Sequence, residues 1–552
     1  MGEDAFWTKV MRQRTSRRTL LRAGALTGVG LWASSVLGCG GSSQQGATLS
    51  GGTPGAGTAV AKVTPKYGGE LRIGKGANPT YVDPMKSSGG DDVHLYNLIY
   101  TAYLLDITDD GQLVPSVAES WTVPDPKTVI FKIRPGVKFH DGTDVDSAAV
   151  KFCVERGKDA KFASPRRSAY LQIDSVDTLD PLTVKLNLTA PSASLLYGLR
   201  GAGPLLSPTA IQKWGDDFER HVVSAGPFQL ESYTPDRELV FKRFENYFEK
   251  DKDGNQLPYL DRIRIQIISD PTVMVSSLEA GDIDVIAGTG MSAIYLPRVE
   301  GNRNLSLVTS KASSLIFLQV HWEDPPTDNL DLRKAISYGI DRNEIVKSIY
   351  DGHAAPAATI LPASMGAWLD PKLPAPSFDP AKAKEYLAKA GYPNGLKLKA
   401  ATYTLFKDHI SALQAQLSRV GIDLTVDVMD TVAYGKAFRE TKPSAYPLGV
   451  TAYGHYADPD QILTPYFSIN GGYYIGREKV PEVESLLEKG RSTYDIKERQ
   501  TIYYQLENFF NDRLLVIPLI NSDKFMTVRS NVKGFTVGAM CYGEVRRIWL
   551  DK

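Results

Sequence analysis

Histidine, cysteine and serine, which often carry catalysis or bind metals, form no catalytic pattern in this chain. The seven histidines include no i, i+4 pair and no His-Glu-x-x-His sequence, although ligands distant in sequence can still converge in space. No Gly-x-Ser-x-Gly sequence marks the nucleophile of a serine hydrolase. Residues 69–75 imitate a phosphate-binding loop, but Gly76 stands where a serine or threonine would hold Mg²⁺. We therefore predict no enzyme, no metal site and no cofactor.

The composition predicts a globular protein without a nucleic-acid partner. The chain has 552 residues, of which 42% are hydrophobic, and this length can bury more than one core. Because 63 Lys and Arg balance 63 Asp and Glu, the chain has no basic field to attract nucleic acid. Three cysteines in such a length exclude a disulfide scaffold.

The N-terminal residues 1–39 have the character of an export signal. Several arginines come first, and a mildly apolar run follows at residues 23–37. As a helix this run would span about 22 Å, which is short of the roughly 30 Å hydrocarbon core, so a signal is favoured over a transmembrane helix. Residues 16–22, with Arg17 and Arg18, resemble a twin-arginine export signal.

The apolar run ends in a sequence that predicts a lipid anchor. Residues 36–39 (VLGC) resemble a bacterial lipobox, in which Cys39 becomes the diacylated N-terminus after cleavage. Leu37 is bulkier than the small residue usual there, and an ordinary signal with an incidental cysteine is the alternative. Residues 40–65 are rich in Gly, Ser, Gln, Thr and Ala and predict a flexible linker. We expect an extracytoplasmic protein tethered to the membrane by lipid.

The remainder of the chain alternates helical and strand patterns. Asp270-Pro271 predicts a helix start that Gly281 ends, and residues 283–286 then read as a short strand. Asp379-Pro380 begins a second helix of the same kind. An apolar face at 410–420 leads into an alternating strand at 422–428. Helices that lead directly into strands predict an α/β protein.

Five ordered motifs resemble the family 5 extracellular solute-binding proteins, the oligopeptide-, dipeptide- and nickel-binding group of ABC transporters. Each motif alone is weak, but five in the same order over some 350 residues are specific. They are residues 113–121 (LVPSVAESW) with 129–142 (VIFKIRPGVKFHDG), 226–248, 278–284 (LEAGDID), 332–342 (LRKAISYGIDR) and 457–460 (ADPD).

The resemblance implies an α/β, two-lobed periplasmic-binding-protein-like fold of type II, cluster C. It has an extra small domain and a hinge between the lobes, which close on ligand. From the family's discontinuous first lobe we expect lobe I at 66–105, 223–320 and 522–552, the extra domain at 106–222, and lobe II at 321–521.

The resemblance also points to one departure in the ligand site. In peptide-binding members an aspartate, three residues before the acidic-Pro pair, holds the peptide's α-ammonium. Counting back from Asp458, that place belongs here to His455, unless the loop count slips by a residue or two. A neutral imidazole cannot compensate a buried ammonium as a carboxylate does, and a protonated one repels it. We therefore expect a neutral or anionic ligand, such as an oligosaccharide, or a peptide held differently.

Six further residues are predicted to contact ligand. Aromatic rings with a polar edge suit the walls of a ligand cleft, although core packing is an equal alternative. One histidine precedes the place where the family chain crosses between lobes, and two serines match an early loop that reaches the cleft in relatives or that forms a flexible turn. The six residues are Tyr453, Tyr456, Trp322, His321, Ser87 and Ser88.

By resemblance, the protein captures a small solute by hinge closure and delivers it to the permease and ATPase subunits of an ABC importer. A monomer that breaks no bond in its ligand suffices for this role. Two alternatives stay open: a ligand-sensing lipoprotein without a transport role, and an exported hydrolase. The ligand itself does not follow from the residue types, because it depends on the geometry of the cleft.

Overall fold

The computed structural model describes residues 64–79, 81–87, 97–108, 111–165, 167–286, 295–441, 443–454, 456–476, 479–536 and 545–551. The chain divides into two units, Met1–Val63 and Thr64–Lys552, and the fold is that of the second. The predicted export signal and Cys39 lie outside the described residues. Within the described residues, every helix is too short or too polar to cross a bilayer.

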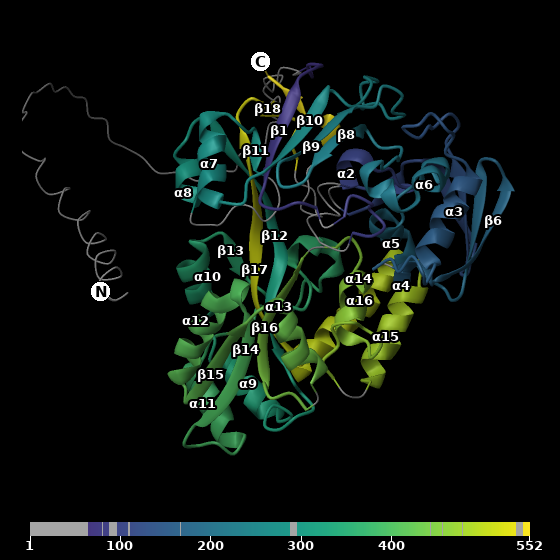
Figure 1. Ribbon diagram of the computed structural model, residues 1–552. Coiled ribbons are helices and arrows are strands. Elements are labelled where there is room, and N and C mark those ends of the chain that lie inside the picture. Colours follow the sequence, from purple (N-terminus) through teal and green to yellow (C-terminus); the bar gives the residue numbers. More distant parts are fainter. Residues whose placement is uncertain are drawn as a thin grey trace, which may run out of the picture. The chain divides into compact units, whose positions relative to one another are not determined.

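A mixed sheet of eleven strands extends through this unit (Figure 1). The strand order is β15-β14-β16-β12-β17-β11-β1-β10-β9-β8, and β13 pairs with β17. We name the β11-to-β8 side lobe I and the β13-to-β16 side lobe II. The lobe I strands are β1 (Glu70–Lys75), β8 (Phe228–Thr234), β9 (Glu238–Arg243), β10 (Arg262–Ile267) and β11 (Val285–Ile286). The lobe II strands are β13 (Ala354–Pro356), β14 (Leu396–Tyr403), β15 (Ile422–Met429) and β16 (Leu448–Gly454).

Two long antiparallel strands, β12 (Leu305–Val320) and β17 (Val516–Arg529), belong to both lobes. The first part of β12 pairs with the end of β17, which also pairs with β11 of lobe I. From Ser314 onward β12 pairs with β16 of lobe II as well. The register shifts between Ser310 and Ser314, where Ala312 has a φ of 50° and its N–H donates to Asp523 Oδ1 at 2.8 Å. This irregularity lies where the ladder passes from one lobe to the other.

The lobe II part of β12 is apolar on both faces because helices cover the sheet on both sides. Ile316, Leu318 and Val320 point into one core and Leu315 and Phe317 into the other, as expected for a strand whose side chains alternate. The helices of the first core are α9 (Leu330–Tyr338), α10 (Arg342–Tyr350), α11 (Pro380–Lys389) and α12 (Lys407–Ser418). The second core is formed with η6 (Ala363–Trp368), α14 (Asp460–Phe467), α15 (Pro481–Ser492) and α16 (Ile496–Arg513). Between β14 and β16 the chain also forms η7 (Thr404–Phe406), α13 (Thr431–Tyr434) and η8 (Gly435–Glu440).

A small domain built on a four-stranded antiparallel sheet, order β4-β5-β7-β6, shares one hydrophobic core with lobe I. Its strands are β4 (Ala118–Asp125), β5 (Thr128–Ile133), β6 (Ile173–Asp180) and β7 (Thr183–Leu188), with the hairpin β2 (Leu105–Ile107) and β3 (Leu113–Pro115) beside them. Its helices are α3 (Ser147–Lys158), α4 (Arg167–Tyr170), α5 (Ser194–Ala202), α6 (Pro208–Trp214) and η3 (Gly215–Arg220). Lobe I adds α2 (Asn97–Tyr100), α7 (Pro271–Ala280), α8 (Leu296–Glu300), β18 (Val532–Lys533), η9 (Val545–Arg547) and β19 (Trp549–Leu550).

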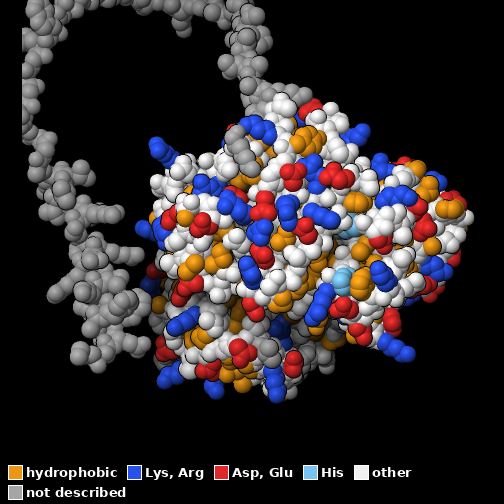
Figure 2. All heavy atoms as spheres, turned by 45° about the horizontal axis from the view of Figure 1, so that its top comes forward, with side chains coloured by type: hydrophobic (Ala, Val, Ile, Leu, Met, Phe, Trp, Pro, Cys, Tyr) orange, Lys and Arg blue, Asp and Glu red, His pale blue; other side chains and the backbone are white. Residues whose placement is uncertain are grey.

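The charges on the surface are mixed in sign. On the face in Figure 2, acidic and basic side chains are interspersed among apolar ones, in agreement with a formal net charge of +0. The electrostatic character of a binding site must therefore come from individual side chains and their partners.

One carboxyl group in the core of lobe II has no cationic partner among its hydrogen bonds. Glu507 on α16 is fully buried and accepts a hydrogen bond from Thr359 Oγ1 at 2.8 Å and from the Asp370 N–H at 2.7 Å. Burial raises the pKa of Glu507 to about 7, the two donors oppose that rise, and the nearby charge of Asp370 adds to it. The folded protein therefore favours the protonated form of this side chain.

We expect this group to make stability depend on pH. Because the folded-state pKa of Glu507 exceeds its ordinary value of 4.5, its contribution to stability is intact below that value and is lost as pH rises through about 7. Between pH 4.5 and pH 8, this effect should lower the free energy of unfolding of the wild type by on the order of 2 kcal/mol in denaturant titrations. Glu507→Gln, which mimics the protonated form, should not show this decrease. Glu498→Gln, on the same helix but exposed, is the control. A Glu507→Gln protein with the wild-type pH profile would contradict this account.

Candidate functional site

The carboxyl ends of three strands in lobe II lie at one edge of the sheet. β14 pairs in parallel with both β15 and β16, so Tyr403, Met429 and Gly454 end their strands in the same direction. In open α/β sheets, ligands bind outside the carboxyl ends of the strands. The segments that follow these ends are η7, the α13–η8 helical stretch and the loop at residues 455–459. Side chains that could hold a ligand are therefore expected on these segments.

Arg439 on η8 is a half-buried cation among tyrosines. Its guanidinium carbon lies 4.9 Å from the ring centroid of Tyr473 and 5.7 Å from that of Tyr434. Tyr473 in turn stacks on Tyr466, with centroids 4.8 Å apart and ring planes at 26°. Among the residues that the structure describes, no carboxylate or other group forms an ion pair or hydrogen bond with the Arg439 side chain.

The tyrosines around Arg439 do not supply the missing negative charge. Burial raises the pKa of Tyr434 and of Tyr466, and the nearby Arg439 guanidinium opposes this rise without reversing it. The pKa of Tyr403 is raised by burial as well. These phenols therefore stay neutral at physiological pH, and the cluster carries the charge of its arginine. A carboxylate would be a favourable partner, because charge-assisted hydrogen bonds to guanidinium are strong and geometrically specific.

A second cation lies at the carboxyl end of β16. Lys524 of β17 is half-buried, and its Nζ lies 3.4 Å from where a Cβ on Gly454 would stand. Within the described part of the chain, its amino group has no ion-pair partner. Arg439 on η8 and Lys524 beside Gly454 are thus two half-buried cations without a counter-ion among the described residues, and each could receive an anionic guest.

A buried ion pair fixes the end of the loop that follows β16. Asp458 Oδ2 lies 2.6 Å from Arg499 Nη1 and Asp458 Oδ1 lies 3.0 Å from Arg499 Nη2, with the side chains 0% and 1% exposed. Arg499 also donates to the Gly490 carbonyl at 2.7 Å. Removing one partner of such a pair would leave an uncompensated buried charge, so this pair fixes the base of the loop rather than receiving a ligand.

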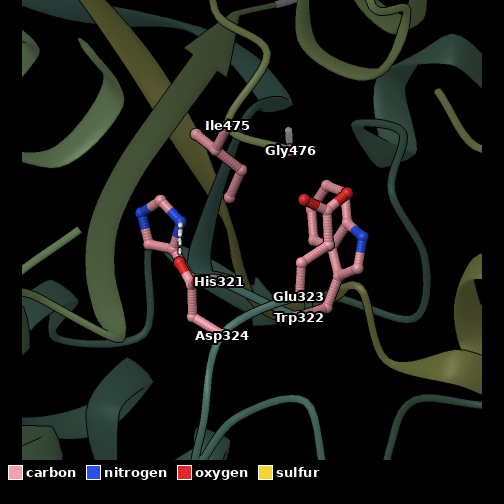
Figure 3. Close-up of a pocket in the computed structure, with 6 residues that line it drawn as sticks. All are labelled: His321, Trp322, Glu323, Asp324, Ile475 and Gly476. Atoms are coloured by element: carbon pink, nitrogen blue, oxygen red, sulfur yellow. Dashed lines mark ion pairs between the residues drawn. The ribbon is translucent and has the colours of Figure 1, made fainter. Parts of the chain in front are cut away.

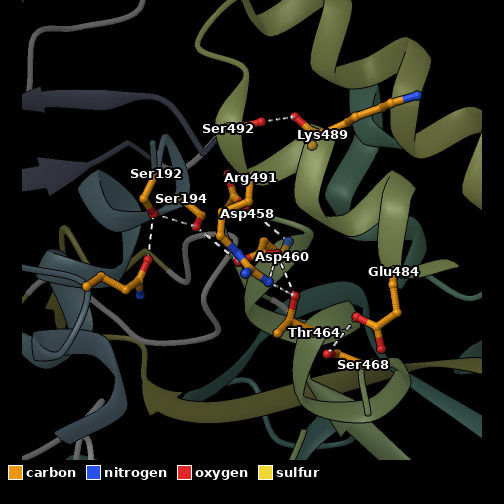
Figure 4. Close-up of polar contacts among 12 residues, drawn as sticks. Ser192, Ser194, Asp458, Asp460, Thr464, Ser468, Glu484, Lys489, Arg491 and Ser492 are labelled. Atoms are coloured by element: carbon orange, nitrogen blue, oxygen red, sulfur yellow. Dashed lines mark hydrogen bonds and ion pairs between the residues drawn. The ribbon is translucent and has the colours of Figure 1, made fainter. Parts of the chain in front are cut away.

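Lobe II also touches the small domain directly, through the segment that follows this pair (Figure 4). Ser194 Oγ on α5 donates to Asp460 Oδ2 on α14 at 3.0 Å, and both side chains are buried. Arg491 Nε holds the same carboxylate oxygen at 3.2 Å, and the Arg491 carbonyl accepts the Ala193 N–H at 2.7 Å. Tyr494 Oη donates to the Pro126 carbonyl at 3.1 Å. Lobe II and the small domain are therefore held together here by hydrogen bonds between protein groups, without a ligand.

We expect the Ser194–Asp460 contact to favour the closed arrangement without ligand. Ser194→Ala removes one buried hydrogen bond, worth about 1 kcal/mol, and should raise the ratio of open to closed molecules about fivefold. Distances between spin labels on α5 and α15 of the ligand-free protein would measure this ratio. Ser175→Ala, which removes a hydroxyl bonded only within the small domain at 3.0 Å from Asn187 Nδ2, is the control. An unchanged distance distribution in Ser194→Ala would show that the contact does not set the equilibrium.

The two tyrosines predicted in β16 and its loop have different environments. Tyr453 is buried in the lobe II core, where its ring packs against Phe317 and Tyr466 and its hydroxyl donates to the Ile360 carbonyl. Tyr456 is 36% exposed and close enough to affect Tyr466 electrostatically. Of the two, Tyr456 lies at the surface, near Tyr466 of the Arg439 cluster. Its neighbour His455 lies outside the described residues.

His321 and Trp322 lie together at the other end of β16. The His321 N–H donates to the Pro447 carbonyl at 3.0 Å, and His321 Nε2 lies 2.9 Å from the Phe438 carbonyl oxygen. Both residues line a small hollow with Glu323, Asp324, Ile475 and Gly476 (Figure 3). The length of the strand, roughly 20 Å, separates this hollow from Gly454. The structure thus does not bring His321 and Trp322 together with Tyr456.

Ser87 is fully buried in the loop after β1. Ser88, the other serine predicted there, lies outside the described residues. Among the described residues no group of three His, Cys, Asp or Glu side chains could hold a metal ion.

Sequence reasoning missed Arg439 and Lys524. Nothing in their local sequence sets them apart from the other arginines and lysines. What distinguishes them is that no described residue acts as their counter-ion, and this is a property of the fold. The only available signal was the position of Arg439 in the segment after the alternating strand at 422–428, where α/β folds place ligand-binding residues.

Comparisons with known proteins agree with this architecture. The profile described as bacterial extracellular solute-binding proteins, family 5 Middle, matches residues 112–474. The glutathione-binding protein GsiB of Escherichia coli O1:K1 / APEC is 28% identical over 491 residues, which cover 85% of this chain and 92% of GsiB.

Two solved structures show the same fold. AgaA from A. tumefaciens R10, in complex with agropinic acid, has a TM-score of 0.71 at 27% identity and covers 88% of this chain and 99% of its own. DppA from Helicobacter pylori, in complex with the peptide STSA, has a TM-score of 0.73 at 23% identity with the same coverage, 88% and 99%. The predicted two-lobed α/β fold is confirmed.

Proposed function

The chain belongs to the family 5 extracellular solute-binding proteins of bacteria, and we propose that it captures a small anionic, peptide-like solute for an ABC importer. Capture takes place outside the cytoplasmic membrane, and the closed protein then meets the permease and ATPase subunits of the importer. The ligand leaves chemically unchanged, since the protein's part is to bind and release it.

The observation that carries this proposal is the half-buried guanidinium of Arg439, which has no counter-ion among the described residues. A cation kept partly out of water is costly unless a partner arrives, and a carboxylate is the partner that a guanidinium receives with two parallel hydrogen bonds. The faces of Tyr473 and Tyr466 beside it can cover the flat or apolar body of the same molecule.

The named relatives support the same class of ligand. GsiB is described as a glutathione-binding protein, and the AgaA structure contains agropinic acid. Both compounds are small carboxylic acids, and glutathione is also a peptide. A histidine at position 455, in place of an aspartate, agrees with an anionic guest because it removes a negative charge from the site.

We propose that His455 and Tyr456 contact the ligand from lobe II and that Ser87 and Ser88 lie on the lobe I side. His321, Trp322 and Tyr453 would then support the site through the core of lobe II. Closure would bend β12 and β17 at the irregularity between Ser310 and Ser314, since that is where the ladder leaves one lobe for the other.

We expect Arg439→Ala to weaken the binding of glutathione, the probe that we choose, at least tenfold in calorimetric titrations, because the carboxylate loses a charge-assisted partner worth about 1.5–3 kcal/mol. Lys436→Ala is the matched control, since Lys436 is an exposed cation on the same helical turn. Equal affinity in the wild type and Arg439→Ala would remove Arg439 from the site. Failure of glutathione and agropinic acid to bind the wild type would argue against an anionic, peptide-like ligand.

We also propose that the protein is exported through the twin-arginine route and anchored by acyl chains on Cys39. The support is the sequence: Arg17-Arg18 before a weakly apolar run, VLGC at its end, and a polar linker at 40–65. A lipid at Cys39 would keep the binding unit close to the importer while the linker lets it reach the permease.

Cys39→Ala should shift the protein from the membrane fraction to the soluble extracytoplasmic fraction and abolish labelling with palmitate. Ligand affinity should stay at the wild-type value, because the anchor lies outside the binding unit. A Cys39→Ala protein that stays in the membrane fraction would contradict the lipid anchor, and export that continues when the twin-arginine translocase is inactivated would contradict the route.

A further inference from the structure

A second cavity lies away from the lobe II site, between the small domain and lobe I. It has a volume of about 410 Å³ and is lined by the β3 end of the hairpin, the turn after β5, the loop after β9 and the C-terminal η9. None of its lining residues comes from lobe II. Four chain segments far apart in sequence thus meet around one hollow.

A self-balanced ion network forms one wall of this cavity. Arg546 Nη2 lies 2.6 Å from Asp106 Oδ2, and Arg546 Nη1 lies 3.2 Å from Glu249 Oε2. Asp106 Oδ1 is held by Arg200 Nε at 2.5 Å from behind the cavity. Although burial opposes it, the two guanidiniums hold the pKa of Asp106 well below its usual range. Two carboxylates therefore match two guanidiniums, and the network leaves no net charge.

The remaining charged residues of the cavity are all cations. Arg134, Lys250 and Arg547 line it, and no described carboxylate lies within ion-pair distance of Arg134 or Lys250. Among the described residues, the Arg134 side chain donates only to the Ser116 carbonyl, at 3.4 Å from both Nε and Nη2. Its guanidinium carbon lies 5.9 Å from the Phe248 ring centroid. The cavity thus holds an excess of positive charge, in a protein whose formal net charge is +0.

The lining of the cavity also contains apolar side chains. These are Val114 and Pro115 of β3 and the ring of Phe248. A hollow of this volume, lined by both cations and apolar side chains, matches a small organic anion better than a bare ion, because a bare ion would leave the apolar groups uncovered.

We propose that this cavity is a second binding site, distinct from the transported ligand's site, for a small organic anion with two or more carboxylates. Arg134 receives one carboxylate while it rests on Phe248, and Lys250 holds the other. Because the pocket is formed jointly by the small domain and lobe I, occupancy would stiffen the connection between these two bodies without requiring lobe closure.

Calorimetric titration of the protein with citrate, at constant ionic strength set with NaCl, tests the site. We expect saturable binding of one citrate, weakened roughly tenfold or more by Arg134→Gln and by Lys250→Ala. Lys242→Ala, an exposed lysine on β9 outside the cavity, should leave it unchanged. Arg439→Ala should also leave citrate binding unchanged, which separates this site from the one in lobe II.

Absence of citrate binding beyond the NaCl reference would overturn the proposal, as would citrate affinity that neither Arg134→Gln nor Lys250→Ala changes. Citrate binding that is lost in Arg439→Ala would overturn it too, because the anion would then occupy the lobe II site. Because the cavity variants should still bind glutathione with wild-type affinity, a negative result here leaves the transport proposal standing.

Discussion

The paired strands β12 and β17 carry the sheet across both lobes, and the proposed site in lobe II depends on that ladder. Its lobe II half is buried on both faces and fixes β16, whose carboxyl end leads to the loop that we propose contacts the ligand. Its lobe I half joins β11. The irregularity between Ser310 and Ser314 is the place where regular pairing is interrupted between these two halves. In the proposed closure, movement of the lobes would bend this pair, while core packing on either side would keep each lobe rigid.

Charge is used in two different ways around this frame. Asp458 and Arg499 neutralise each other in the core and hold the loop in place. Arg439 and Lys524, in contrast, are half-buried without a described counter-ion. An anionic ligand could supply the negative charge that is missing beside them. The hydrogen bond of Ser194 to Asp460 joins lobe II to the small domain without a ligand, and we expect it to favour closure. The free energy of closure then includes both the contacts of the ligand with these cations and the Ser194–Asp460 hydrogen bond. A ligand shifts the equilibrium between open and closed protein only through contacts that are stronger in the closed form.

Much of the fold was readable from local signals. Asp270 caps α7, Gly281 ends it with a φ of 87°, and the helix before β15 and the strand itself were both predicted. These features depend on residues close in sequence. The binding site was harder, since Tyr453 and Tyr456 look alike in sequence but one hydroxyl is committed to the Ile360 carbonyl and the other residue is at the surface. Arg439 stands out only once the positions of all carboxylates are known. His321 follows the end of β12, several residues beyond the irregularity between Ser310 and Ser314.

Small-angle scattering combined with mass spectrometry of the recovered guest tests the central claim most directly. We predict that glutathione, added to the wild type, reduces the radius of gyration as the lobes close and is recovered with its mass unchanged. A guest that binds tightly without compaction, or that is recovered with an altered mass, would contradict the account of a protein that closes on an intact anionic solute.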